Sequence, residues 1–90
     1  MMLKIFTSKR FDKELKRAVR RGKDPEEIKS VMQKLARQEP LGFKYRDHKL
    51  AGDFHDCREC HIQPDWLLIY LIDGNSIIFV RTGTHADLFK

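Results

Sequence analysis

The chain is predicted to be an α+β domain in which two helices precede a sheet. Three observations favour this class: a short strand-like start, two amphipathic segments joined by a brief link, and three strand-like runs in the last third. Helices gathered before a run of strands indicate that both helices pack on one face of the sheet. Ninety residues provide room for one hydrophobic core, so we expect a single domain over residues 1–90.

The first half is predicted to contain a strand and a first helix. Residues 3–7 alternate as a short strand does, and Ser8 is placed to cap the helix that follows. Gly22 is expected to end this helix. The predicted apolar face consists of Phe11, Leu15, Ala18 and Val19. The rest of the helix surface is basic. This is either an ordinary solvated face or a surface that binds nucleic-acid phosphates.

A second helix is predicted to run antiparallel to the first. Asp24 supplies an N-cap and Pro25 a proline at the first helical position, and Pro40 is expected to stop the helix. Its apolar stripe consists of Ile28, Val31, Met32 and Leu35. The link between the helices is too short for any arrangement other than a helical hairpin.

The second half is predicted to form a three-stranded antiparallel meander after an irregular segment. Residues 41–56 are expected to be a loop, with a short strand or turn near residues 48–50. The expected strands are residues 58–63, 66–72 and 76–81, the last two joined by a turn at residues 73–75. Residues 82–89 form a tail with room for one helical turn. Trp66, Tyr70 and Phe79 are expected in the core.

Strand alternation separates the side chains of residues 58–63 into two sets. One face is predicted to carry Arg58, Cys60 and Ile62, and the other Glu59, His61 and Gln63.

Charge favours a polyanionic partner. Lysine and arginine total 18 against 13 acidic residues, which gives a net charge of +5. Such a balance is typical of proteins that bind nucleic acid, or an acidic protein that covers the same face. No signal peptide or apolar run long enough for a membrane span is evident, and the two cysteines do not make a disulfide framework. We therefore expect a cytoplasmic protein that does not contact membranes.

Several polar residues stand at expected strand ends and have the chemistry of acid–base catalysis. His61 lies near a strand end and Asp65 follows at the next turn, so a tight hairpin would bring them to one patch. Arg81 ends the last strand and His85 follows a glycine-containing turn. An arginine there can hold a phosphate and a histidine can donate a proton to a leaving oxygen. A turn aspartate, a salt-bridging arginine and solvated histidines would give the same pattern.

The other candidates are less specific. His48 and His55 fit exposed loop histidines as well as a site. A zinc site built from His55, Cys57, Cys60 and His61 is disfavoured, because in a strand the two cysteines would point to opposite faces. Phe89 either stacks on a base or packs under the sheet.

These motifs resemble the YafQ-type toxins of the RelE/ParE superfamily of bacterial type II toxin–antitoxin modules. The resemblance covers nearly the whole chain and rests on three segments in order. They are Asp47-His48 with Leu50 and Gly52; Arg58-x-x-His61-x-x-Pro64-Asp65-Trp66 with Leu68 and Tyr70; and Arg81-Thr82-Gly83-Thr84-His85 with Leu88-Phe89.

The resemblance implies a ribosome-dependent mRNA endonuclease that cuts the codon in the ribosomal A site. It implies a catalytic set of His48, His61, Asp65 and His85, and a substrate-binding set of Arg81, Phe89 and Lys49. In this scheme the 2′-hydroxyl attacks its own phosphate and leaves a 2′,3′-cyclic phosphate. Asp65 would be the general base and His85 the general acid, and neither a metal nor another cofactor is needed.

The resemblance also implies partners and two rival functions. The expected partners are mRNA, the ribosome and a cognate antitoxin, with operator DNA bound only through the antitoxin. One rival is a ParE-like toxin that inhibits gyrase, and the other is a catalytically silent RNA- or protein-binding module. Neither rival needs the three histidines.

Overall fold

The computed structural model describes residues 1–89 and has a five-stranded mixed sheet with strand order β1-β5-β4-β3-β2. Strand β1 (Lys4–Thr7) runs parallel to β5 (Ser76–Gly83), and β4 (Trp66–Asp73), β3 (Arg58–Gln63) and β2 (His48–Lys49) follow in antiparallel order. The predicted α+β class is confirmed. The predicted meander is its antiparallel centre, and the N-terminal strand and the short strand at His48 complete its two edges.

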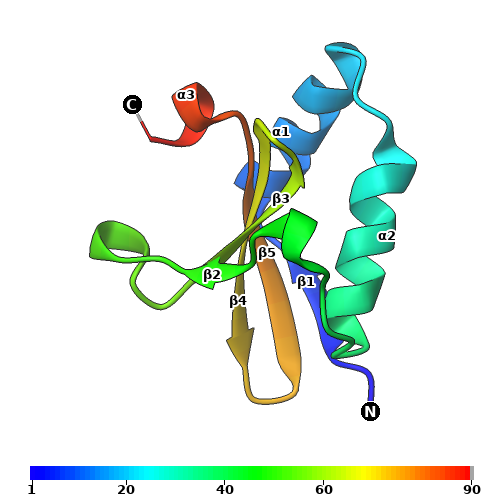
Figure 1. Ribbon diagram of the computed structural model, residues 1–90, viewed down its shortest axis with the longest axis vertical. Helices are drawn as coiled ribbons and strands as arrows, with labels where there is room; N and C mark the ends of the chain where they lie inside the picture. The colour runs from blue at the N-terminus through cyan, green and yellow to red at the C-terminus, as the bar shows by residue number, and fades with distance from the viewer. Residues whose placement is uncertain (90) are drawn as a thin grey trace.

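Two helices lie together on one side of this sheet, as predicted (Figure 1). They are α1 (Lys9–Arg20) and α2 (Pro25–Ala36). The short 3₁₀ helix η2 (Gly52–Phe54) and the C-terminal helix α3 (His85–Leu88) lie on the other side. A further 3₁₀ turn, η1 (Phe43–Tyr45), leads from α2 into β2. None of the helices in residues 1–89 is long and apolar enough to cross a membrane.

The helix starts were predicted correctly, and one helix end was not. Ser8 Oγ accepts the Phe11 amide at 2.9 Å, and Asp24 Oδ1 accepts the Glu26 amide at 2.9 Å. Helix α2 ends at Ala36, before Pro40 is reached. Gln38, at a φ of +59°, closes it with a Schellman motif in which the Gln38 and Glu39 amides donate to Leu35 and Lys34 carbonyls.

The main core lies between the helices and the sheet. Phe11 of α1, Ile28 of α2, and Trp66, Tyr70 and Phe79 of the sheet are at most 1% exposed, which confirms their predicted positions. Val19 was expected on the apolar face of the first helix but is 41% exposed. A helix face is wider than the contact it makes with the sheet, and Val19 lies at the margin of that contact.

A second, smaller core covers the opposite face of the sheet. It contains Leu67 and Ile69 of β4 and Leu88 of α3, all buried. Leu50 and Phe54, from the segment around η2, pack against it. The tail and the β2 segment therefore turn a face that would otherwise be open to solvent into a partly buried surface.

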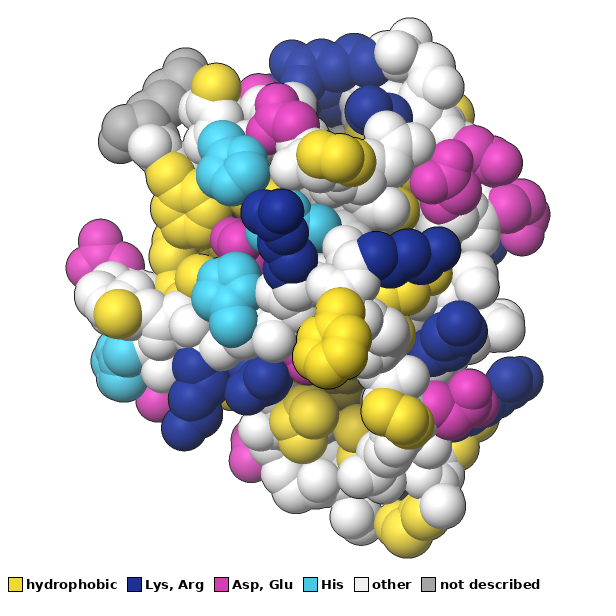
Figure 2. All heavy atoms as spheres, viewed as in Figure 1, with side chains coloured by type: hydrophobic (Ala, Val, Ile, Leu, Met, Phe, Trp, Pro, Cys, Tyr) yellow, Lys and Arg dark blue, Asp and Glu magenta, His cyan; other side chains and the backbone are white. Residues whose placement is uncertain are grey.

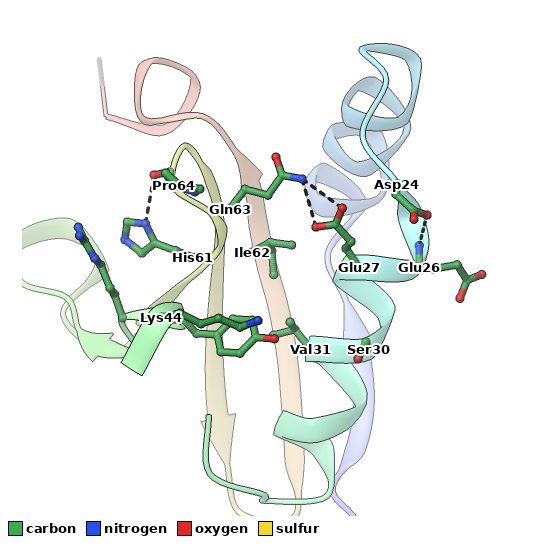
Figure 3. Close-up of a pocket in the computed structure, with 12 residues that line it drawn as sticks. Asp24, Glu26, Glu27, Ser30, Val31, Lys44, His61, Ile62, Gln63 and Pro64 are labelled. Atoms are coloured by element: carbon green, nitrogen blue, oxygen red, sulfur yellow. Dashed lines mark hydrogen bonds between the residues drawn. The ribbon is translucent and has the colours of Figure 1, made fainter. Parts of the chain in front are cut away.

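A register shift at the end of β3 overturns one prediction. Strand pairing shifts between His61 and Gln63, so the alternation of side chains breaks there. Gln63 turns toward α2, where its Nε2 donates to the Glu27 carboxylate at 3.1 and 3.2 Å (Figure 3). His61 points away from that helix. The expectation that both residues share one face is wrong.

Candidate active site

Three histidines meet on the sheet face opposite the helices. The His61 ring centroid lies 6.3 Å from that of His48 and 5.8 Å from that of His85. In Figure 2 histidine side chains gather near the middle of the view, with Lys or Arg side chains beside them. The three residues come from β2, β3 and α3, so the fold brings together positions that span 38 residues of the chain.

His48 is fixed by its neighbour in the loop. Its Nδ1 lies 2.6 Å from the Arg46 carbonyl oxygen, and a carbonyl only accepts, so Nδ1 carries the proton. Arg46 has a φ of +48°, which turns its carbonyl toward the ring. A short strand or turn was expected near residues 48–50, and His48 indeed begins a two-residue edge strand in which it faces Glu59 in register.

His61 is buried, at 7% exposure, and its ring is fixed in the same way. Its Nδ1 lies 3.3 Å from the carbonyl oxygen of Pro64, the turn residue that follows the strand (Figure 3). His61 also lines a groove of about 700 Å³ between β3, η1 and α2, together with Lys44 and Arg46. The α2 side of the same groove is lined by the carboxylates of Asp24, Glu26 and Glu27.

Glu59 lies beneath the histidines and was not singled out from the sequence. It is 4% exposed, and its Oε1 lies 3.5 Å from both His48 Nε2 and His61 Nε2. Its other oxygen, Oε2, is buried and has no hydrogen-bond partner within residues 1–89. The only signal in the sequence was strand alternation, which placed Glu59 on the His61 face but gave no reason to expect burial.

His85 and Asp65 form a bonded pair at the rim of the cluster. Asp65 Oδ1 accepts from the His85 backbone amide at 2.9 Å and from His85 Nδ1 at 2.8 Å. These two bonds lower the pKa of Asp65. The sequence predicted that Asp65 and His61 reach a common patch, and His85 is the residue that links them.

Helix α3 is held in place by a compact set of contacts around Asp87. Thr84 and Asp87 form a capping box, and Arg21 Nη1 donates to Asp87 Oδ2 at 2.9 Å. The Thr84 amide and Arg21 lower the pKa of Asp87 to about 2. A Cβ on Gly83 would lie 2.9 Å from Asp87 Cβ, so this approach requires glycine. His85, between Thr84 and Asp87, is positioned as a result.

Phe89 lies beside the cluster rather than under the sheet. It is 44% exposed, packs edge-on against Phe54 with centroids 6.1 Å apart, and lies 6.5 Å from the His85 ring. Of the two alternatives left open by the sequence, the exposed position is the one that the structure shows.

Two predicted substrate-binding residues are not brought into the cluster. Arg81 is 8% exposed and is bonded to Glu14 of α1, with 2.6 Å between Arg81 Nη2 and Glu14 Oε2. Lys49 follows His48 in β2, where it pairs in register with Arg58. Because side chains alternate along a strand, the exposed side chain of Lys49 points to the face opposite His48. Their roles as phosphate ligands stay predictions.

The Cys-x-x-Cys segment does not form a metal site. Cys60 packs in the core beneath the helices and Cys57 against the core on the other face. Burial raises the pKa of both thiols, which disfavours the thiolates that zinc binds. His55 lies apart, with its side chain 72% exposed next to Asp56.

A different set of residues offers metal ligands. One ligand atom each from Glu59, His61 and His85 all lie within 4.8 Å of one another. One carboxylate and two imidazoles are a donor set that zinc and copper accept.

Known proteins are similar to this chain in both sequence and fold. Residues 3–90 match the family described as "Bacterial toxin of type II toxin-antitoxin system, YafQ". The mRNA interferase toxin YafQ of Escherichia coli K12 is 41% identical over 83 residues, which cover 91% of this chain and 90% of that protein.

Solved structures agree with the sequence match. The E. coli DinJ–YafQ toxin–antitoxin complex contains a chain with a TM-score of 0.91, 38% identity and full coverage of both chains. A metal-bound toxin from Helicobacter pylori has a TM-score of 0.92 and 48% identity, and the match covers 98% of this chain and all of that one. The chain therefore belongs to the YafQ family of type II toxin–antitoxin toxins.

Proposed function

We propose that this toxin is an endoribonuclease that cuts mRNA in the ribosomal A site, in the cytoplasm. The observation that carries the proposal is the Asp65–His85 pair at the rim of a cluster of histidines. The bond between the two residues uses Asp65 Oδ1 and His85 Nδ1. Asp65 Oδ2 and His85 Nε2 therefore lie at the two ends of the pair, as an in-line reaction across a phosphate requires of its base and acid. The mRNA interferase name of the E. coli relative supports the same activity.

The reaction follows from these two atoms. Asp65 takes the proton of the 2′-hydroxyl, whose oxygen forms a bond to its own phosphorus. The bond from phosphorus to the 5′ oxygen breaks, and His85 Nε2 gives that oxygen its proton. The products are a 2′,3′-cyclic phosphate and a 5′-hydroxyl, and His48 and His61 stabilise the charge that develops on the phosphate.

Exposed groups around the cluster would hold the message. Phe89 offers an aromatic face for a base beside His85. Lys49 and the basic face of α1 offer charges for phosphates farther along the RNA or on ribosomal RNA. Arg81 would reach a phosphate only with the part of its guanidinium that Glu14 does not occupy.

Cleavage of a defined mRNA on programmed ribosomes tests this function. We expect a cut within the A-site codon by the wild type, mapped by primer extension. His85→Ala should lower the rate by about 10²- to 10⁴-fold, because it removes the general acid. His55→Ala is the matched control and should cut normally, since His55 lies outside the cluster. If His85→Ala cut as fast as the wild type, the proposed acid would be wrong. Absence of cutting by the wild type would favour gyrase inhibition or a silent binding module.

The proposed chemistry needs no metal, although the cluster offers ligands for one. A chelator selective for transition metals, added with Mg²⁺ retained for the ribosome, should leave the rate unchanged. Loss of cutting with the chelator and its recovery with Zn²⁺ or Cu²⁺ would show that the reaction depends on an ion.

We further propose that a cognate antitoxin neutralises the protein and carries the complex to operator DNA. The E. coli relative is solved in a complex with DinJ, and the net charge of +5 suits an acidic partner. Co-expression with the antitoxin should relieve growth arrest, and binding to operator DNA should require the antitoxin. Binding of operator DNA by the toxin alone would contradict this arrangement.

A further inference from the structure

The segment that carries His48 is attached to the sheet by few contacts. None of residues 37–56, all of which the structure describes, is buried, and its apolar side chains reach the two cores only as partly buried groups. Strand β2 is the outermost strand of the sheet and pairs with β3 over only two residues, His48 and Lys49 (Figure 1). The bond from His48 Nδ1 to the Arg46 carbonyl stays within the segment. A segment with so few buried contacts opens locally unless other bonds hold it.

Asp47, the residue before His48, supplies such bonds. Its Oδ1 accepts from Tyr70 Oη at 2.7 Å and from Arg58 Nε at 3.3 Å, and its Oδ2 accepts from Arg58 Nη2 at 3.4 Å. Tyr70 is 1% exposed on the central strand β4, and Arg58 is its register partner on β3. Burial and the bond to Asp47 raise the pKa of Tyr70, so the phenol keeps its proton and is the donor. Both oxygens of the carboxylate are therefore tied to well-packed strands.

These bonds also fix the face on which His48 lies. Asp47 reaches Tyr70, which packs in the main core on the helix side of the sheet, whereas His48 lies on the opposite face beside His61. The two neighbours thus point to opposite faces, as successive residues of a strand do. A slip of one residue in the pairing of β2 would put Asp47 or Lys49 in the place of His48. A ladder of two residues resists such a slip weakly, and the bonds of Asp47 oppose it.

We propose that Asp47 is a positioning residue that, anchored by Tyr70 and Arg58, holds His48 in the histidine cluster. All three residues belong to the sequence motifs described above, and none of them was among the predicted site residues. The fold brings them together from the start of β2, from β3 and from β4. The effect of Asp47 on cleavage rests on the proposed nuclease function, in which His48 stabilises charge on the phosphate.

Amide hydrogen exchange tests this hold without any assay of cleavage. The Leu50 amide donates to the Cys57 carbonyl at 3.0 Å, so its exchange reports whether the end of β2 stays bonded to the neighbouring chain. In Asp47→Ala this amide should exchange about 10- to 100-fold faster than in the wild type, while the buried amides of β4 keep their rates. Tyr70→Phe, which removes only the hydroxyl, should give a smaller increase at the same amide. Asp53→Ala removes an exposed carboxylate from the same segment and is the matched control, with no change expected.

Two outcomes of the exchange experiment would overturn the inference. One is a Leu50 amide that exchanges alike in the wild type and in Asp47→Ala. The other is faster exchange of all amides by the same factor, which would assign Asp47 to overall stability rather than to the placement of β2.

A double-mutant cycle in the cleavage assay tests whether Asp47 acts through His48. Asp47→Ala should lower kcat by about 10- to 100-fold with KM little changed, because a displaced ring costs rate while the other RNA contacts remain. In a His48→Ala background the same change should cost little, since the ring that Asp47 positions is already absent. Equal losses in the two backgrounds would contradict the inference. If the wild type cuts no RNA, the nuclease proposal fails, and the exchange of the Leu50 amide alone decides whether Asp47 holds β2.

Discussion

The molecule buries two glutamates on opposite sides of its sheet, and they differ in how well they are paired. Glu14 accepts from Arg81 Nε and Nη2 and from the Thr82 amide, so both of its oxygens are bonded. Glu59 has two imidazole nitrogens at 3.5 Å and one oxygen without a partner within residues 1–89. The exposures of the two residues are similar, at 7% and 4%.

The difference separates a carboxylate that holds two elements of the fold together from one that lies among candidate catalytic groups. The Glu14–Arg81 pair ties α1 to the end of β5, and removing either member would leave the other charge buried and alone. Within residues 1–89 Glu59 makes no comparable hydrogen bonds, and its Oε1 lies 3.5 Å from His48 Nε2 and from His61 Nε2.

The largest expected effect is a loss of stability when the buried Glu14–Arg81 pair is broken. Arg81→Met should lower the free energy of unfolding by about 3–5 kcal/mol, because it leaves the Glu14 carboxylate buried without a partner. Urea denaturation measures it. Arg37→Met, which breaks an exposed pair with Glu39, should change it by less than about 1 kcal/mol. Combining Arg81→Met with Glu14→Leu should restore most of the loss. Equal, small losses from both single variants would show that the buried pair is not structural.

An intermediate effect, on the rate of cleavage, is expected from changing Asp65 at the rim of the cluster. Asp65→Asn should lower the single-turnover cleavage rate by about 10- to 100-fold, because it removes the proposed base and the charge that orients His85. Stability should hardly change, since both side chains are more than half exposed. Asp56→Asn is the control, because Asp56 pairs with its neighbour His55, which lies outside the histidine cluster. An Asp65→Asn protein that cuts at the wild-type rate would remove Asp65 from the mechanism.

The smallest expected effect is on the stability that Asp87 contributes by holding α3 in place. The pKa of Asp87 is lowered to about 2, so its contribution to stability is present above about pH 4 and is lost as the pH falls through 2. Asp87→Asn should therefore cost roughly 1–2 kcal/mol at neutral pH, little at pH 2 and nothing well below it. Chemical denaturation at several pH values measures this. A cost that did not depend on pH would assign the effect to packing rather than to charge.

Much of the fold follows from local signals in the sequence. The caps at Ser8 and Asp24 and the turn at Gly74 are each encoded within a few residues, and each was confirmed. The apolar stripes of the helices were confirmed except at Val19, which is 41% exposed. The helix end placed at Pro40 was wrong because Gln38 takes a left-handed conformation without being glycine. The side assigned to Gln63 was wrong because a bulge in β3 carries no composition signal.

The site was harder to predict because it depends on long-range contacts. His48, His61, Asp65 and His85 were singled out, and the structure gathers them. Two features could not be read from the chain: the burial of Glu59 beneath His48 and His61, and the pairing of Arg81 with Glu14 across 67 residues. Each is set by packing between distant segments.

The contrast between the two glutamates is tested most directly by comparing Glu14→Gln with Glu59→Gln in one buffer, by urea unfolding and by single-turnover cleavage. Glu14→Gln should lose several kcal/mol of stability, because the Arg81 guanidinium is left without a buried counter-charge. Glu59→Gln should keep the wild-type unfolding midpoint and lose most of its cleavage. The opposite result, a Glu59→Gln protein that unfolds as readily as Glu14→Gln while its folded fraction cuts at the wild-type rate, would contradict a contribution of Glu59 to cleavage.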